Sequence, residues 1–426
     1  MTEAATLLTL GGSGENGRNC YLLSTKEGCI LLDCGVKRTV TPEAVGEYPL
    51  LTPELAARIQ AVFLSHAHED HCAALPLLYA LGFSGTIYGS RETIDGAPRM
   101  IRKWMTFVES QGGILPYTQA EMDRIRFSVL EPGESRIGSL RILTGRSGHT
   151  AGSLWISIGW KQEGWQLFYS GDMCLCSSSL ACDMPPVCDH ALLNCAYAGR
   201  NLQQDEQYRL LHLRAHETLA RGGKLLLPVP PTGRGCDMLL SLASAFPDAP
   251  IFAAESIVLN ARSLLKDVRW LRAGLPEETL LDRIHPLKTQ EDYSSACSGG
   301  PGILLVTDGM LTTPEGLLCL HLLGGYAGHR VILTGHAAPG TAAGNLLDPD
   351  RRAEQRLAIE AEMLTIKVHL DDADALTIQH RLQSQSTVLF HAPAAHCLGT
   401  IKAFTHAGAS CACLMPGEHT VLDAAD

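Results

Sequence analysis

The sequence predicts an α/β protein in which one α/β domain is inserted into another. Up to residue 172, short apolar runs separated by glycine-rich or charged turns are typical of strands. From about residue 200, apolar runs alternate with helical patterns, which indicates βαβ units and a largely parallel sheet. The last segment returns to strands, and no Ser/Gly-rich linker separates the parts, so an insertion explains this order better than two tethered domains.

The N-terminal part is expected to consist mainly of strands. Apolar runs of strand length cover residues 6–10, 20–24, 29–33, 61–65, 124–130, 140–145, 154–160 and 166–172, and a helix is expected at 72–83. Between the first two runs, Gly12, Gly14 and Gly17 match the pattern G-x-G-x-x-G. A dinucleotide-binding loop of that kind must open a helix, whereas a strand pattern follows here. We therefore expect a turn between antiparallel strands.

The central part alternates between the two kinds of element. Helices are expected at 207–221 and 232–246, and strands at 224–230, 302–310 and 329–335. The chain then closes with strands at 386–393 and 411–413. This order predicts a second, mainly parallel sheet in the middle of the chain.

Composition limits the class of protein. Hydrophobic residues make up 46% of the 426 residues and charged residues 19%, which is typical of a folded protein and not of a disordered one. We find no signal peptide and no apolar run long enough to cross a membrane, so a cytoplasmic protein without membrane contact is expected. The net charge of −11 argues against tight non-specific nucleic-acid binding, although bound divalent metals would add positive charge locally.

Fifteen cysteines are spread over the chain. Their odd number and the absence of an export signal favour reduced thiols. Two C-x-C pairs, Cys174/Cys176 and Cys411/Cys413, lack the doubled C-x₂-C spacing of a structural zinc site. Ordinary thiols are therefore expected.

The strongest chemical signal is L-S-H-A-H-E-D-H at the end of an apolar strand. It places His66, His68, Asp70 and His71 within six residues. In an extended loop His66 and His68 point the same way, and Asp70 and His71 can turn toward a second point. Imidazole and carboxylate ligands suit Zn²⁺ or a similar transition metal, with Mn²⁺ as the alternative.

Three further residues complete a set of two metal sites. His149 follows a strand in S-G-H-T-A-G-S, Asp172 ends the strand run L-F-Y-S-G-D, and His391 follows S-T-V-L-F. One ion would take His66, His68 and His149, and the other would take Asp70, His71 and His391, with Asp172 bridging them. A hydroxide shared by the two ions would be the nucleophile for a phosphodiester. Asp33 could orient a ligand from behind or cap a turn.

These motifs resemble the β-CASP nucleases of the metallo-β-lactamase superfamily, which include RNase J-type enzymes and the mRNA 3′-end cleavage endonuclease. The resemblance rests on G-G-S-G-E-N-G-R-N-C, L-L-D-C-G, the histidine cluster, G-H-T-A-G-S and Y-S-G-D. It continues through A-Y-A-G-R, P-T-G-R-G-C-D-M-L-L, T-D-G-M-L-T and G-H-A-A-P-G-T-A-A-G-N-L-L, which look like degenerate landmarks of the inserted domain. It covers nearly the whole chain.

The resemblance implies a fold, a domain plan and an activity. The fold would be the αββα sandwich of the metallo-β-lactamases with an inserted β-CASP α/β domain. Residues 1–195 would form the first part of the sandwich, 196–362 the insertion and 363–426 the completing part. The activity would be hydrolysis of RNA held between the two domains, and an endonuclease fits this length better than an RNase J-type exonuclease. A homodimer, or a heterodimer with another β-CASP protein, is a further possibility that the family suggests.

Two family positions depart from the pattern. Asn194 stands where the first β-CASP motif has an acid, and we align Asp372, in L-D-D-A-D-A, with the histidine of S-A-H-A-D. In the family that histidine lies near the scissile phosphate and the acid supports it. An ionised Asp372 could not donate a hydrogen bond there, whereas a protonated one could. We therefore count Asp70, Asp172, Asp372 and Asn194 as catalytic candidates, and we expect Asn194 and Asp372 to touch.

Other departures affect charge near the expected RNA. Asp308 stands in D-G-M-L-T where the family has serine, and G-T-A-A-G lacks the arginine of G-T-x-G-R. Arg200 and Arg234 could bind phosphate, or could be ordinary solvated or ion-paired arginines. His336 and His396 flank the expected site and could be structural or could replace the missing histidine.

Three functions are compatible with the sequence. The first is a metal-dependent RNA endonuclease. The second is a catalytically weakened homologue that acts as a binding or regulatory subunit. The third is a small nucleotide phosphodiesterase that uses the same metals. The complete ligand set favours an enzyme, and the changed auxiliary residues favour the second or third function over an efficient general ribonuclease.

Overall fold

A computed structural model describes residues 5–41, 44–160, 164–275 and 277–422. The chain divides into two compact units. The first comprises Met1–Leu175, Cys182–Asn201 and His369–Asp426, and the second comprises Cys176–Ala181 and Leu202–Val368. The domain ends expected after residues 195 and 362 fall a few residues before these boundaries, and Cys176–Ala181 groups with the second unit.

The first unit contains two seven-stranded sheets and a small two-stranded one. The first sheet, in spatial order, consists of β22 (His419–Leu422), β1 (Ala5–Gly11), β2 (Cys20–Thr25), β3 (Gly28–Leu32), β6 (Ile59–Phe63), β7 (Thr86–Gly89) and β8 (Phe127–Val129). The second consists of β21 (Ser410–Ala412), β20 (Ser386–Phe390), β13 (His190–Asn194), β12 (Leu167–Tyr169), β11 (Leu154–Trp160), β10 (Leu140–Arg146) and β9 (Gly133–Ile137). The small sheet pairs β4 (Lys37–Val40) with β5 (Val45–Glu47).

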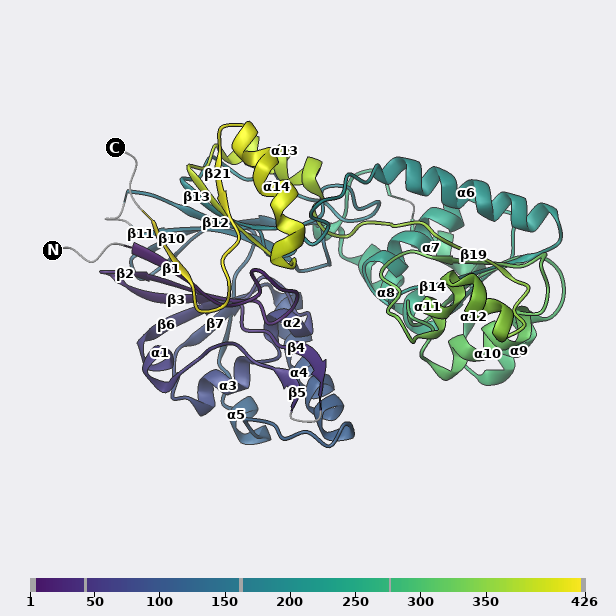
Figure 1. The fold of residues 1–426 in the computed structure, drawn as a ribbon, viewed down its shortest axis with the longest axis horizontal. Helices are drawn as coiled ribbons and strands as arrows, with labels where there is room; N and C mark the ends of the chain where they lie inside the picture. Colours follow the sequence, from purple (N-terminus) through teal and green to yellow (C-terminus); the bar gives the residue numbers. More distant parts are fainter. Residues whose placement is uncertain (1–4, 42–43, 161–163, 276, 423–426) are drawn as a thin grey trace. The chain divides into compact units, whose positions relative to one another are not determined.

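Helices cover the outer faces of these two sheets (Figure 1). Those beside the first sheet are α1 (Pro53–Arg58), α2 (Glu69–Cys72), α3 (Leu75–Ala80), α4 (Arg91–Ser110) and α5 (Gln119–Asp123). Those beside the second are α13 (Asp372–Leu382) and α14 (Ala394–His406). The inner faces meet through aromatic rings, since Tyr21 of β2 lies 5.9 Å from Tyr169 and 5.4 Å from Phe390 between ring centroids. The expected αββα sandwich is therefore confirmed.

Burial explains why each layer holds together. Trp104 and Ile101 of α4 pack with Leu31 and Val62 of the first sheet. All seven residues of β11 are buried, as expected for a strand covered on both faces. The helix α4 is capped at its N-terminus by Ser90, whose hydroxyl accepts a hydrogen bond from the Thr93 N–H.

The second unit is built on one six-stranded sheet. Its strands, in spatial order, are β16 (His285–Leu287), β15 (Ile251–Ala254), β17 (Gly302–Val306), β14 (Lys224–Pro228), β18 (Arg330–Leu333) and β19 (Glu360–Met363). Every neighbouring pair in this sheet is parallel, which confirms the expected parallel sheet. The three central strands are buried along their whole length.

Helices connect the strands of the second unit, as parallel pairing requires. They are α6 (Gln204–Ala220), α7 (Arg234–Ala245), α8 (Glu255–Lys266), α9 (Gln290–Cys297), α10 (Pro314–Leu323), α11 (Ala342–Leu347) and α12 (Pro349–Glu354), with 3-10 turns η1 (Val268–Trp270) and η2 (Glu278–Arg283). Among the described residues of the chain, no helix is long and apolar enough to cross a membrane. All fifteen cysteines are free thiols, as expected.

Candidate metal centre

The seven residues expected to bind metal come together at the ends of strands in the first unit. His66 and His68 follow β6, and α2 then carries Asp70 and His71. The others follow three strands of the second sheet: His149 lies between β10 and β11, Asp172 follows β12, and His391 follows β20. Because β12, β13 and β20 run parallel, their carboxyl ends meet at one edge.

One oxygen of Asp172 is the centre of this cluster. Five imidazole nitrogens lie between 3.4 and 3.7 Å from Oδ2, from His66, His71, His149, His369 and His391. These gaps are too long for hydrogen bonds. Zinc–imidazole bonds of about 2.0–2.1 Å would place two donors of one ion roughly 3.3 Å apart, so the spacing suits shared metal ligands.

The donors form three groups, two of which contain Asp172. His66, His68, His149 and Asp172 have donor atoms within 4.8 Å of one another, and so do Asp70, His71 and His391, and Asp172, His369 and His391. The Nε2 atom of His66 is buried and has no hydrogen-bond partner, which a bound cation would supply. The residues present therefore fit divalent metal ions, as the sequence predicts.

Asp33 orients His71 from behind. Its Oδ2 lies 2.6 Å from His71 Nδ1 and accepts from Tyr169 OH, while Oδ1 accepts the Ser65 N–H at 2.7 Å. This arrangement directs the other ring nitrogen, Nε2, toward Asp172. Asp33 and His391 both adopt left-handed backbone angles, with φ of 56° and 65°. Such angles are uncommon outside glycine and often mark functional sites.

The glycine-rich loop and its neighbours fix the backbone around the cluster. The carbonyl of Gly12 accepts the His391 N–H at 2.7 Å, and this glycine has φ of 89°. A Cβ on Gly35 would lie 1.7 Å from the Asp70 carbonyl oxygen, so only glycine fits there. The loop joins the antiparallel strands β1 and β2, which confirms the expected turn.

Electrostatics divide the histidines into two kinds. Burial, followed by the charge of His149, lowers the pKa of His68 to about 4, so its ring is neutral and offers a lone pair. Burial also lowers the pKa of His391, but the charges of Asp172 and Asp70 outweigh this effect and raise that pKa to about 8. Burial opposes ionisation of Asp70, yet His71 and His391 lower its pKa well below the ordinary value.

His369 is a member of the cluster that the sequence alignment missed. Its Nδ1 lies 3.6 Å from Asp172 Oδ2, and its ring centroid is 4.8 Å from that of His149 and 5.0 Å from that of His391. It occurs in K-V-H-L-D, where Asp371 follows two residues later, as the aspartate does in S-A-H-A-D. His369 therefore matches the histidine of the second β-CASP motif in its spacing from an aspartate. This spacing could have identified it.

Among the described residues, Asp372, which we aligned with that histidine, does not belong to the groups of close metal-type donors. Asp372 starts α13, and its carboxylate accepts the Gly199 N–H at 3.1 Å and the Thr400 hydroxyl. No hydrogen bond between described residues joins it to Asn194, so the expected contact of these two side chains is wrong. Asn194, at the end of β13, instead donates from Nδ2 to Asp172 Oδ1 at 2.7 Å.

The two arginines occupy different environments. Arg200 lies in the first unit and is exposed, with its guanidinium 5.9 Å from the ring centroid of Tyr197. Tyr197 in turn lies 5.9 Å from the ring of His369. Arg234 lies in the second unit and donates from Nη1 to the carbonyls of Thr334 and Ile366. Backbone groups therefore occupy part of the Arg234 guanidinium that phosphate binding would need.

Other family landmarks also serve the local fold. The Asp308 carboxylate accepts the N–H of Met310 at 2.8 Å and that of Thr312 at 3.2 Å, so it stabilises its own turn. His396 is exposed on α14 and is absent from the groups of close metal-type donors among the described residues. His336 is also exposed and belongs to the second unit.

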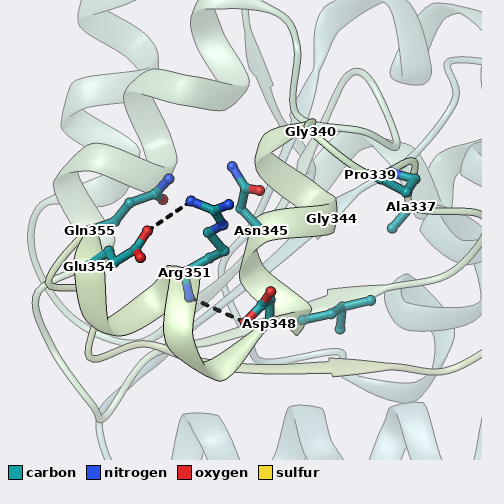
Figure 2. Close-up of a pocket in the computed structure, with 10 residues that line it drawn as sticks. Ala337, Pro339, Gly340, Gly344, Asn345, Asp348, Arg351, Glu354 and Gln355 are labelled. Atoms are coloured by element: carbon teal, nitrogen blue, oxygen red, sulfur yellow. Dashed lines mark hydrogen bonds and ion pairs between the residues drawn. The ribbon is translucent and has the colours of Figure 1, made fainter.

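The stretch G-T-A-A-G-N-L-L lines a cavity of about 750 Å³ in the second unit (Figure 2). The charged groups on its wall are paired within α12 and its cap. Arg351 donates to Glu354 at 3.0 Å, and Asp348 accepts the N–H groups of Asp350 and Arg351. The cavity therefore offers no cluster of free catalytic groups among the residues that line it.

Comparisons with known proteins place this site in context. A sequence profile for the β-lactamase superfamily domain matches residues 29–223. Transcription termination factor FttA of a Lokiarchaeum species is 25% identical over 79% of this chain and 57% of its own length. Integrator complex subunit 11 of Danio rerio is 23% identical over 97% of this chain and 73% of its own length. Endoribonuclease YSH1 of Candida albicans is 24% identical over 90% of this chain and 48% of its own length.

The chain spans little more than half the length of the FttA proteins it matches. A crystal structure of a protein of unknown function from Enterococcus faecalis has the same fold. It superposes with a TM-score of 0.61 over 98% of this chain and 100% of the other, at 14% identity.

Proposed function

We propose that the chain is a divergent member of the β-CASP group of the metallo-β-lactamase superfamily and that it hydrolyses phosphodiester bonds in RNA, as a metal-dependent endonuclease. The observation that carries this proposal is the convergence of five imidazole nitrogens on one oxygen of the buried Asp172 carboxylate. Buried groups of this kind are rarely placed together unless they bind a cation.

Two divalent ions fit the donor set, with Zn²⁺ favoured by its nitrogen-rich composition and Mn²⁺ as the alternative. His66, His68 and His149 would hold one ion, Asp70, His71 and His391 the other, and Asp172 both. When bound, such ions activate water and neutralise charge on the phosphate. Asp70 and Asp172 stay catalytic candidates in this proposal.

The protein's own side chains supply the remaining functions. His369 lies at the edge of the cluster and can donate a hydrogen bond to a phosphoryl oxygen or to the leaving group. It replaces Asp372 in that role. Asp33 keeps His71 in the orientation that its ligand role needs.

Two observations support RNA as the substrate. One relative is named an endoribonuclease and another a transcription termination factor. In this chain, the exposed Arg200 beside Tyr197, whose ring lies 5.9 Å from that of His369, provides a cation that can pair with phosphate. Arg234 is a weaker candidate for this contact because backbone carbonyls occupy its guanidinium.

The test compares the protein with Asp172→Ala on labelled RNA in the presence of Zn²⁺ or Mn²⁺. We expect internal cleavage by the unchanged protein and a loss on the order of 10³-fold in the variant, because a shared metal ligand supplies several kcal/mol of transition-state stabilisation. RNA binding without cleavage by either protein would support a regulatory subunit instead. Hydrolysis of bis(p-nitrophenyl) phosphate without RNA cleavage would support a small phosphodiesterase.

A cytoplasmic location and pairing with a second copy, or with another β-CASP protein, stay predictions from the sequence. Sedimentation of the purified chain, alone and with a β-CASP protein of the same organism, would test the pairing.

A further inference from the structure

Asn194 is the one position of the cluster where an acid of the family has become an amide. It ends β13, is fully buried and pairs with Phe390, the residue before His391. Its side-chain nitrogen Nδ2 donates to Asp172 Oδ1 at 2.7 Å. The contact joins the substituted family position directly to the carboxylate at the centre of the donor cluster.

The amide and an ionised acid would act differently at this point. A carboxylate is an acceptor only, so an ionised acid could not donate to Asp172 and would repel it. An amide of the same shape donates without a net charge. Because Oδ1 of Asp172 is occupied in this way, Oδ2 is the oxygen that faces the five histidines.

The surroundings hold the amide in the donating orientation. The backbone N–H of Asn194 donates to the Ser170 hydroxyl at 2.9 Å, which fixes the end of the strand. The side-chain oxygen accepts the Ala196 N–H at 3.4 Å. Since this N–H must face the amide oxygen, the NH₂ group is left to face Asp172.

We propose that Asn194 is a positioning residue of the metal centre, whose amide holds Oδ1 of Asp172 so that Oδ2 stays directed at the histidines that would bind metal ions. This inference rests on the proposed function, since it requires that the cluster binds two ions. It also gives the departure from the family a physical role: the replacement removes an acid and adds a donor to the bridging ligand.

The experiment measures metal binding in the absence of RNA. The full chain, Asn194→Leu and Asn194→Asp are stripped of metal and titrated with Mn²⁺. Stoichiometry and affinity are measured by competition with a chelator, and the magnetic coupling of the two ions by electron paramagnetic resonance. Asn260→Leu is the matched control, because it removes an amide that donates to the Pro231 carbonyl in the second unit.

We expect two coupled ions in the unchanged protein and in Asn260→Leu. In both Asn194 variants the second ion should bind about 10–100-fold more weakly, as for other residues that orient metal ligands, and the coupled signal should fall. If both Asn194 variants bind two ions with unchanged affinity and coupling, the inference about Asn194 is overturned while the proposed function stands. Failure of the unchanged protein to bind two ions would overturn the proposed function. If Asn194→Leu does not fold, Asn194→Asp decides, because it matches asparagine in size.

Discussion

The two units of the protein use their charged residues in opposite ways. In the first, donors from separate strand ends converge on Asp172, and the buried His66 Nε2 has no hydrogen-bond partner among the described residues. In the second, the charged residues at family landmarks bond mainly to backbone groups. Arg234 Nη1 donates to two carbonyls, although its buried Nε has no hydrogen-bond partner among the described residues, and Asp308 accepts two N–H groups of its own turn.

This difference shows which side chains of a diverged sequence indicate a ligand and which serve the local fold. Several imidazole groups that converge on one buried carboxylate oxygen, at distances too long for hydrogen bonds to it, imply a ligand from outside the chain. Groups whose bonds are filled by the local backbone explain the fold of a loop, whatever the family uses that loop for. Substitutions in the first unit should therefore change metal binding and turnover, and substitutions at landmarks of the second should change stability.

The largest expected difference in kcat is between variants of His369 and of Asp372, which lies three positions later in the sequence. His369→Ala should lower kcat for RNA cleavage by about 10²–10⁴-fold, the usual contribution of a proton donor, with two ions still bound. Asp372→Ala should leave kcat within about threefold, since its carboxylate holds Gly199 and Thr400. The measurements are kcat by single-turnover cleavage and metal content of each variant. A larger kcat loss in Asp372→Ala than in His369→Ala would reverse our assignment.

The sequence predicted which residues come together in the donor cluster because their pattern is local. Four of them lie within six residues after a strand, and each of the other three follows an apolar run. His369 was missed because the aspartates after it offered a competing alignment. The contact between Asn194 and Asp372 was expected from the alignment alone. It fails because the start of α13 directs Asp372 to Thr400 of α14, a tertiary contact without a sequence signal.

The fold, too, has elements that the sequence predicted and an element that it did not. The alternation of strands and helices from residue 200 predicted the parallel sheet of the second unit, and apolar runs located most strands of the first. The twenty-residue helix α4 lies in a part expected to be rich in strands and went unpredicted. It contains Gly96 and an internal proline, Pro98, which weaken a helical pattern, and its stability comes from packing residues such as Trp104 into the core.

An intermediate effect is expected at Asp33, which touches a ligand without touching metal. Asp33→Asn keeps the size of the side chain but removes the charge that fixes His71 at 2.6 Å. Affinity for the ion held by Asp70, His71 and His391 should fall by about 10–100-fold, while the ion held by His66, His68 and His149 changes less. Stepwise titration with Zn²⁺ in competition with a chelating dye measures the affinity for each of the two ions. Equal weakening of both ions would show that Asp33 supports the whole fold of the site instead.

The smallest effect is expected at Arg234, in the second unit, and it tests the comparison most directly. Arg234→Met keeps the length of the side chain but removes the donor to the Thr334 and Ile366 carbonyls. The loss should lower the free energy of unfolding by about 1–3 kcal/mol, because part-buried carbonyls lose their partner. KM for RNA should stay within about twofold.

Arg200→Met, at an exposed position, should show the reverse, with unchanged stability and a raised KM for RNA. Urea unfolding and steady-state cleavage measure both quantities for each variant. An Arg234→Met protein of full stability but raised KM would mean that the guanidinium contacts phosphate after all, and the contrast between the two units would then hold only for Asp308.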